Sequence, residues 1–112
     1  MKIKKTLPHL FLCAAACFSL VGHAADGDPV AGKNKTSMCA GCHGIDGMRT
    51  AYPEVYSVPK LKGQNASYIV NALLAYRSGA RKFATMRAIA HDLSDQDIAD
   101  LAAYYSSVKI SK

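Results

Sequence analysis

Apolar side chains recur at helical spacing in three stretches of the chain after residue 25, and the last stretch is the most regular. Its apolar positions are Ile98, Leu101, Ala102 and Tyr105. Intervals of three and four residues place side chains on one face of an α-helix. Ser94 stands at a suitable N-cap position, and Asp97 three residues later gives the pattern of a capping box. The sequence therefore predicts a helix that begins directly after Ser94.

Two further stretches predict helices nearer the N-terminus. One helix is expected from Ser67 to Ser78, where Gly79 offers a C-terminal stop. Its apolar face consists of Tyr68, Ile69, Ala72, Leu73 and Tyr76. Another helix is expected to begin at Asp28, a good N-cap, with Pro29 at the first helical position, and to run toward Met38.

The remaining segments show weaker periodicity. Residues 44–64 have no helical period and are interrupted by glycine and proline, which predicts a long loop of the kind that is usually functional. A short helical turn is expected over residues 87–91. No segment alternates apolar and polar residues for long enough to predict a strand. The pattern as a whole predicts an all-α domain with about three main helices and short helical turns.

The first 24 residues have the pattern of a cleavable secretory signal. Three lysines precede an apolar stretch over residues 7–21, and small residues precede a cleavage site after Ala24. Pro8 interrupts the apolar run, which is shorter than the ~20 residues of a spanning helix. A retained membrane anchor and lipid attachment at Cys17 are the alternatives. We expect a signal over residues 1–24, a mature domain over residues 25–112 and export to the periplasm.

Removal of the signal changes the charge and the cysteine content. The full chain has 14 Lys and Arg residues against 8 Asp and Glu residues, a net charge of +6. Three lysines leave with the signal, so that the mature domain has 88 residues and a net charge of +3. This modest charge predicts no nucleic-acid partner. Two cysteines remain, in a domain small enough to need a cofactor, metal or disulfide for stability.

The segment Cys39-Ala40-Gly41-Cys42-His43 meets that need. Two thiols at this spacing can add to two vinyl groups of one haem, and the adjacent histidine can then bind the iron. A thioredoxin-like pair, half of a zinc site and a disulfide are the alternatives. A zinc site needs two further ligands, and only His91 remains in the mature chain. A thioredoxin-like site is surrounded by strands, and none is predicted here. A disulfide does not require the adjacent His43. We therefore predict one covalent haem c on Cys39 and Cys42, with His43 as an iron ligand.

A sixth iron ligand could come from Met38, Met48, Met86 or His91. Met38 is held at the attachment edge, and Met48 follows His43 on the same face. Met86 lies 43 residues beyond His43, past a predicted helix and in an irregular segment, so that the chain has room to reach the other face. His91 lies among aspartates and is interpreted as a surface histidine. We expect ligation by Met86, and a core-filling role for Met86 is the alternative.

Taken together, these motifs resemble the small soluble bacterial class I c-type cytochromes over nearly the whole mature chain. The resemblance rests on the attachment motif with Asp46-Gly47 after it, Pro59-Lys60-Leu61-Lys62-Gly63-Gln64, Tyr68, Leu73, Gly79-Ala80-Arg81, Met86 and the segment from Leu93 to Tyr105. It implies an all-α fold whose terminal helices cross beside one haem, with His43 and Met86 as axial ligands. It also implies that the carbonyl of Pro59 accepts the N–H of His43 and raises the basicity of that ring.

The loop from Met48 to Val58 departs from the family pattern because it is longer than the family minimum. A single attachment motif excludes the two-haem members of the group. Because two axial ligands leave iron no open site, we expect a single-electron carrier and not an enzyme, which exchanges electrons with periplasmic or membrane-bound redox proteins. The alternatives are a subunit permanently docked on a dehydrogenase and an open-site peroxidase or gas sensor.

Five basic residues flank the two ligand-bearing segments. They are Lys60, Lys62, Arg81, Lys82 and Arg87. If these residues surround the haem edge, they would steer the protein toward an acidic redox partner, whereas scattered surface charge is the alternative. We expect a monomer with no stable membrane insertion after the signal is removed.

Overall fold

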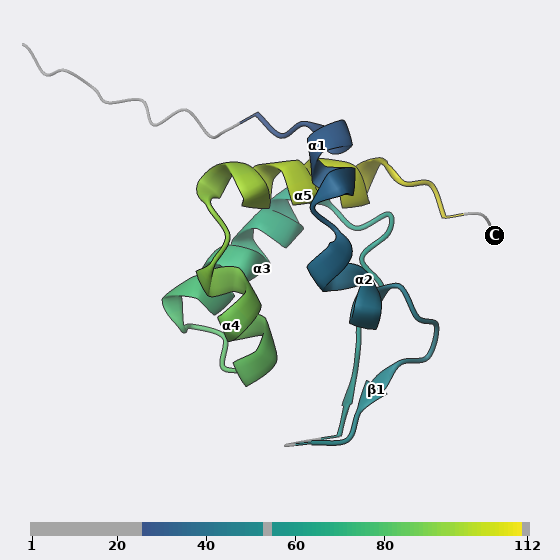
Figure 1. The fold of residues 1–112 in the computed structure, drawn as a ribbon, viewed down its shortest axis with the longest axis vertical. Helices are drawn as coiled ribbons and strands as arrows, with labels where there is room; N and C mark the ends of the chain where they lie inside the picture. Colours follow the sequence, from purple (N-terminus) through teal and green to yellow (C-terminus); the bar gives the residue numbers. More distant parts are fainter. Residues whose placement is uncertain (1–25, 53–54, 111–112) are drawn as a thin grey trace, which may run out of the picture.

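The computed structural model describes residues 26–52 and 55–110, and the predicted signal lies outside them. Within these residues the elements are α1 (Pro29–Asn34), α2 (Ser37–His43), β1 (Arg49–Thr50), β2 (Tyr56–Ser57), α3 (Ala66–Ser78), α4 (Ala84–His91) and α5 (Asp95–Ser107). α1 lies against α5, while α3 and α4 lie on one side of the domain and α2 on the other (Figure 1). The mainly helical architecture confirms the predicted all-α class.

The helices nearest the two ends of the domain cross closely because α1 presents a glycine at the contact. Gly32 is buried, and a Cβ atom built on it would lie 2.0 Å from the carbonyl oxygen of Asp100 in α5. Any larger residue would therefore collide with the backbone of α5. As expected, Asp28 caps α1, since its Oδ1 accepts the N–H of Val30 at 2.8 Å.

A buried carboxylate ties the same two helices together. Asp100 is 2% exposed and accepts the N–H of Asp28 at 2.8 Å and the amide of Gln96 at 2.8 Å. Lys35, which follows α1, donates to Asp100 at 2.6 Å and forms an ion pair with Asp97 at 2.7 Å. The Lys35 ammonium lowers the pKa of Asp100 to about 2, and the N–H of Asp28 adds to this effect. The buried charge is thus fully compensated.

The predicted ends of two helices are confirmed. Ser94 and Asp97 form a complete capping box at the start of α5. Gly79 ends α3 with φ at 83°, a left-handed conformation that favours glycine. α3 begins at Ala66, one residue earlier than expected, because Asn65 accepts a backbone N–H of the first turn and serves as the N-cap.

The prediction of one continuous helix from residue 28 toward Met38 is wrong. The chain forms two helices, α1 and α2, which are separated by Lys35 and Thr36. The Thr36 hydroxyl donates to the carbonyl of Lys33 at 2.8 Å, and the N–H of Lys35 bonds within the last turn of α1. These bonds close α1 in a turn, and a new helix then begins at Ser37.

Two other secondary-structure predictions are also wrong. α4 begins at Ala84 and not at residue 87, so that Met86 lies in a helical turn and not in an irregular segment. Residues 44–64 contain two strands where none was predicted. β1 and β2 pair antiparallel, with Arg49 opposite Ser57 and Thr50 opposite Tyr56. Each strand has two residues, which is too short to show the alternation that identifies strands.

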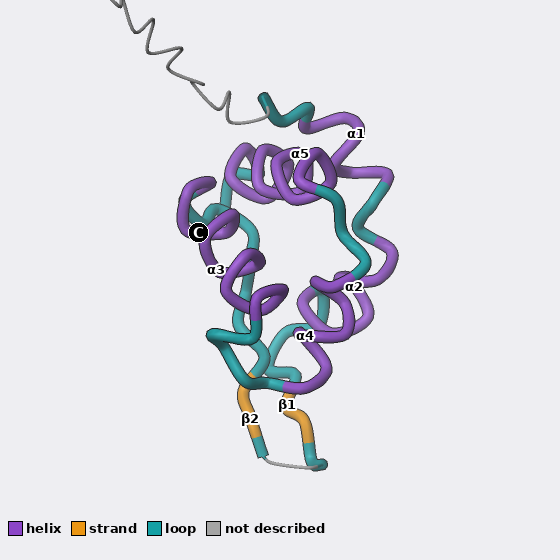
Figure 2. Tube along the Cα trace, turned by 90° about the vertical axis from the view of Figure 1, so that its left-hand side faces the viewer, coloured by secondary structure: helices purple, strands orange, loops and turns teal. Residues whose placement is uncertain are grey.

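The core lies where α3 meets α5. Its buried members are Ile69, Leu101, Ala102 and Tyr105. A side view shows α5 across one end of the domain and the β1–β2 hairpin at the other (Figure 2). Within the described part of the chain, no helix is both long enough and apolar enough to cross a membrane.

Candidate haem site

A large apolar cavity lies between α5 at one end of the domain and the β1–β2 hairpin at the other. The empty space within it is about 1030 Å³, which includes the part that is open to solvent. Ile69, Leu73 and Tyr76 of α3 line it together with Leu101 and Tyr105 of α5. These are among the side chains that the sequence places on the apolar faces of the two helices.

The three reactive side chains of the Cys-x-x-Cys-His motif all line this cavity. Cys39, Cys42 and His43 are carried by α2, and both cysteines are half-buried free thiols. A spacing of three residues places the two thiols on the same face of a helix. The helical conformation of α2 thus presents both sulfur atoms and the imidazole to one space.

The Cys39 thiol has a specific neighbour in α5. Burial raises the pKa of Cys39, while a hydrogen bond with Tyr105 opposes this shift. Burial and the neighbouring Cys39 likewise hold the pKa of the Tyr105 phenol well above its usual range. Both shifts favour the neutral forms of the Cys39 thiol and the Tyr105 phenol.

The His43 ring is oriented from outside α2. Its Nδ1 lies 2.7 Å from the carbonyl oxygen of Pro59. Because a carbonyl oxygen can only accept, Nδ1 must carry the proton, and the lone pair of the neutral ring is then on Nε2. This tautomer leaves Nε2 as the nitrogen that can bind a metal ion.

An ion pair lies beside this contact. Lys60 directly follows Pro59, and its Nζ lies 2.9 Å from Oδ1 of Asp46, three residues beyond His43. The Lys60 ammonium lowers the pKa of Asp46. Both side chains are largely exposed, so that the pair contributes little to stability. It does link the segment of Pro59 to the segment that leaves α2.

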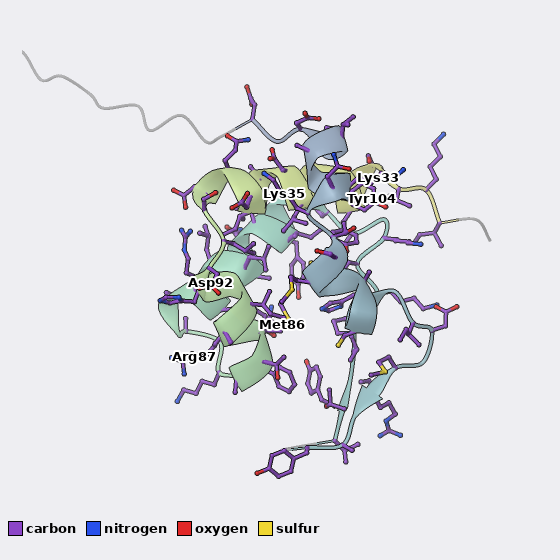
Figure 3. The ribbon with its side chains drawn as sticks, viewed as in Figure 1. Lys33, Lys35, Met86, Arg87, Asp92 and Tyr104 are labelled. Atoms are coloured by element: carbon purple, nitrogen blue, oxygen red, sulfur yellow. The ribbon has the colours of Figure 1, made fainter. Side chains whose placement is uncertain are left out.

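Met86 is brought to the same cavity by α4. The side chain lines the cavity, on the side of α4 that faces α2 (Figure 3). Met48 and His91 are not among the described residues that line it. The side chain of His91 is 80% exposed beside Asp92, as expected for a surface histidine. Met38 reaches the rim of the cavity but is 69% exposed.

Several lining residues were not singled out as site residues by the sequence, and three of them come from two neighbouring segments. Thr50 and Tyr56 come from the β1–β2 hairpin, and Phe83 directly precedes α4. Tyr56 lies in the loop from Met48 to Val58, which is longer than the family minimum. That extra length was the only feature of the sequence that could have indicated a role for Tyr56. No pattern in the sequence indicated that Phe83 faces the cavity.

The donor set and the cavity fit a covalently attached haem. Such a group needs two thiols on one side, a nitrogen ligand beside them and apolar walls. Cys39, Cys42 and the Nε2 atom of His43 supply the first two requirements, and the walls are apolar. Met86 adds a thioether from a second element. The residues present therefore match the chemistry of haem c.

Comparison with known proteins places these features in a family. The family described as cytochrome c matches residues 24–109. Cytochrome c-554(548) of Halomonas halodenitrificans is 49% identical over 84 residues, which cover 72% of this chain and 96% of that relative. Cytochrome c4 of Pseudomonas aeruginosa is 41% identical over 91 residues, which cover 81% of this chain and 43% of that relative. The chain thus spans less than half the length of this second relative.

Comparison of the fold with solved structures also points to the cytochromes c. The crystal structure of reduced recombinant cytochrome c4 from Pseudomonas stutzeri superposes with a TM-score of 0.60 at 38% sequence identity. The match covers 74% of this chain and 46% of that chain. Electron transfer with haem is the general function that these relationships support. The chain therefore belongs to the cytochrome c family, as a small bacterial class I c-type cytochrome.

Proposed function

We propose that this chain is an exported single-electron carrier with one haem held covalently by Cys39 and Cys42 and with His43 and Met86 as axial ligands. One observation carries the proposal: the two thiols and the imidazole of α2 and the thioether of α4 line the same apolar cavity. When bound, such a haem supplies an iron that alternates between the ferrous and ferric states.

The residues of the chain would each have a defined task at this site. Cys39 and Cys42 would fix the position of the ring, and His43 and Met86 would fill both axial positions, so that no substrate reaches the iron. The Pro59 carbonyl, 2.7 Å from His43 Nδ1, would hold the imidazole in one orientation and raise its basicity. The apolar side chains around the cavity would exclude water and so help to set the potential.

We further propose that residues 1–24 direct export to the periplasm and are then removed, and that the mature domain works as a monomer with other redox proteins. An acidic partner would be steered by the basic residues near the cavity. Two of the five are engaged within the chain, since Lys60 pairs with Asp46 and the Arg81 guanidinium lies 4.6 Å from the ring centroid of Tyr76. The ion pair offsets the charge of Lys60, whereas the ring of Tyr76 leaves the charge of Arg81 in place. The charges of Lys62, Arg81, Lys82 and Arg87 would then provide most of the steering.

Mass spectrometry of the exported protein tests covalent attachment. The full chain is expressed in a bacterium that attaches haem c, and the mass after denaturation should equal that of residues 25–112 plus one haem. Replacing both Cys39 and Cys42 with Ala should remove this added mass, because no thiol would remain to hold the haem. Cys17→Ser is the matched control and should retain one haem. A wild-type protein without covalent haem would contradict the proposal.

A further inference from the structure

The β1–β2 hairpin presents one aromatic side chain to the cavity. Thr50 and Tyr56 stand opposite each other across the strands, and both line the cavity. Thr50 Oγ1 accepts the N–H of Tyr56 at 3.2 Å, and the N–H of Val58 donates to the carbonyl of Met48 at 2.9 Å. These bonds fasten the hairpin at its base and at its centre. Tyr56 is thereby held at one edge of the cavity.

The Tyr56 ring packs on the residue that precedes the Met86 helix. The ring centroids of Tyr56 and Phe83 are 5.2 Å apart, and the planes are inclined by 33°. Phe83 occupies the N-cap position of α4, where no side chain caps the helix by a hydrogen bond. Met86 follows three residues later, in the first turn. The aromatic contact thus joins the hairpin to the end of α4 that carries the sulfur.

We propose that the Tyr56–Phe83 contact is a clasp that holds the first turn of α4, and with it the sulfur of Met86, at the cavity. The inference rests on the proposed ligation of iron by Met86, and it assigns Tyr56 and Phe83 as positioning residues. When the two rings separate, the uncapped turn is free to move outward and takes Met86 with it. The hairpin would therefore set the fraction of molecules in which the sixth position is open.

The size of the effect follows from the energy of such a contact. Aromatic pairs in tilted or offset geometry typically shift an equilibrium by about 2- to 13-fold beyond the burial of their area. Carbon monoxide binds reduced haem only where the sixth position is open, so its association rate reports the open fraction. Loss of either ring should raise that rate within this range.

The test measures carbon monoxide association with the reduced holoprotein. Tyr56→Leu and Phe83→Leu should each bind about 2- to 13-fold faster than the wild type. The double variant should be no faster than the faster single variant, because both substitutions break the same contact. Tyr56→Phe keeps the ring and should keep the wild-type rate. Tyr52→Leu is the matched control, since Tyr52 lies on the same hairpin and is 89% exposed.

The outcomes separate the clasp from the ligand assignment. If Met86→Ala binds carbon monoxide much faster than the wild type, the Met86 ligation stands. In that case the clasp is overturned if both leucine variants bind at the wild-type rate. It is also overturned if the rate increases of the two single variants multiply in the double variant. A wild-type protein that binds as fast as Met86→Ala would overturn the Met86 ligation and the clasp with it. If one leucine variant fails to fold, the other removes the same contact and decides the question together with Tyr56→Phe.

Discussion

His43 Nδ1 lies 2.7 Å from the carbonyl oxygen of Pro59, so that a backbone group of one segment fixes the tautomer of a side chain in another. The two residues are 16 positions apart, and the exposed Asp46–Lys60 ion pair links the same two segments. The contact leaves Nε2 of His43 as the ligating nitrogen. Its strength should therefore influence the electronic properties of a bound iron.

Loosening the Pro59 segment should raise the midpoint potential. In Pro59→Ala the carbonyl remains but loses the conformational restriction that proline imposes. A weaker bond to Nδ1 makes the imidazole less basic, and a less basic ligand stabilises ferric iron less. A redox titration checks this prediction. Pro29→Ala, at the first position of α1 and outside the cavity lining, is the matched control and should keep the wild-type potential.

Adding a methyl group at the crossing of α1 and α5 should destabilise the domain. Gly32→Ala would place a Cβ atom 2.0 Å from the carbonyl oxygen of Asp100, and we expect a loss of about 1–3 kcal/mol in unfolding free energy. Gly41→Ala is the control, because a Cβ atom there has nothing within 4 Å. Denaturant titration of both variants measures the difference. Equal stability of the two variants would contradict the close crossing.

The network around Asp100 predicts sensitivity to acid. The pKa of Asp100 is about 2 in the folded protein, below its ordinary value of 3.8. A lowered folded-state pKa stabilises the protein above pH 3.8, and this stabilisation is lost as the pH falls toward 2. Asp100→Asn should therefore be less stable at neutral pH and lose less stability over that interval.

Denaturant titrations across this pH range make the comparison. Asp92→Asn is the matched control, because the side chain of Asp92 is 87% exposed and contacts only His91 among the described ion pairs. This control should follow the wild-type curve. Asp97, whose pKa is also lowered by Lys35, should leave part of the acid sensitivity in Asp100→Asn. A curve for Asp100→Asn that is parallel to that of the wild type would show that the network has no role in acid stability.

Electron transfer with an acidic redox protein should slow as salt is added. Steering by complementary charge raises association rates by about 10- to 1000-fold at low ionic strength. Replacing Lys82 and Arg87 with Gln should lower the rate at low salt and flatten its dependence on ionic strength. Lys109→Gln is the control, because Lys109 lies beyond α5 and adjoins no lining residue in sequence, whereas Lys82 and Arg87 adjoin Phe83 and Met86. A flat salt profile in the wild type would remove the steering hypothesis.

The sequence predicted those parts of the fold that depend on local interactions. The capping box of Ser94 and Asp97 and the left-handed Gly79 are determined within a few residues, and both were predicted correctly. The break between α1 and α2 is an exception, because it was not predicted although local bonds of Lys35 and Thr36 close α1. The Lys35 side chain also bonds to Asp100, 65 residues away, and no local pattern reveals that contact. The hairpin was missed because its pairing depends on contacts between strands of two residues each.

In the candidate site, too, the residues with a local sequence pattern were predicted, and those that depend on tertiary contacts were not. Cys39, Cys42 and His43 are recognisable because their chemistry requires a fixed local spacing. The role of Pro59 came from the family resemblance alone, since the acceptor is a backbone carbonyl that no side-chain pattern reveals. Tyr56 and Phe83 meet only through tertiary packing, 27 positions apart in the numbering. Residues that act through their packing are those that sequence periodicity identifies least well.

The central claim is tested most directly by a redox titration with ferric absorption spectra of the wild type and Met86→Ala. We expect the wild type to show a six-coordinate haem with sulfur ligation. Met86→Ala should lose that ligation and have a lower midpoint potential, because methionine ligation raises the potential. Met48→Ala, which changes a methionine outside the cavity lining, should match the wild type. A ferric spectrum and a potential unchanged in Met86→Ala would contradict a closed His43/Met86 site.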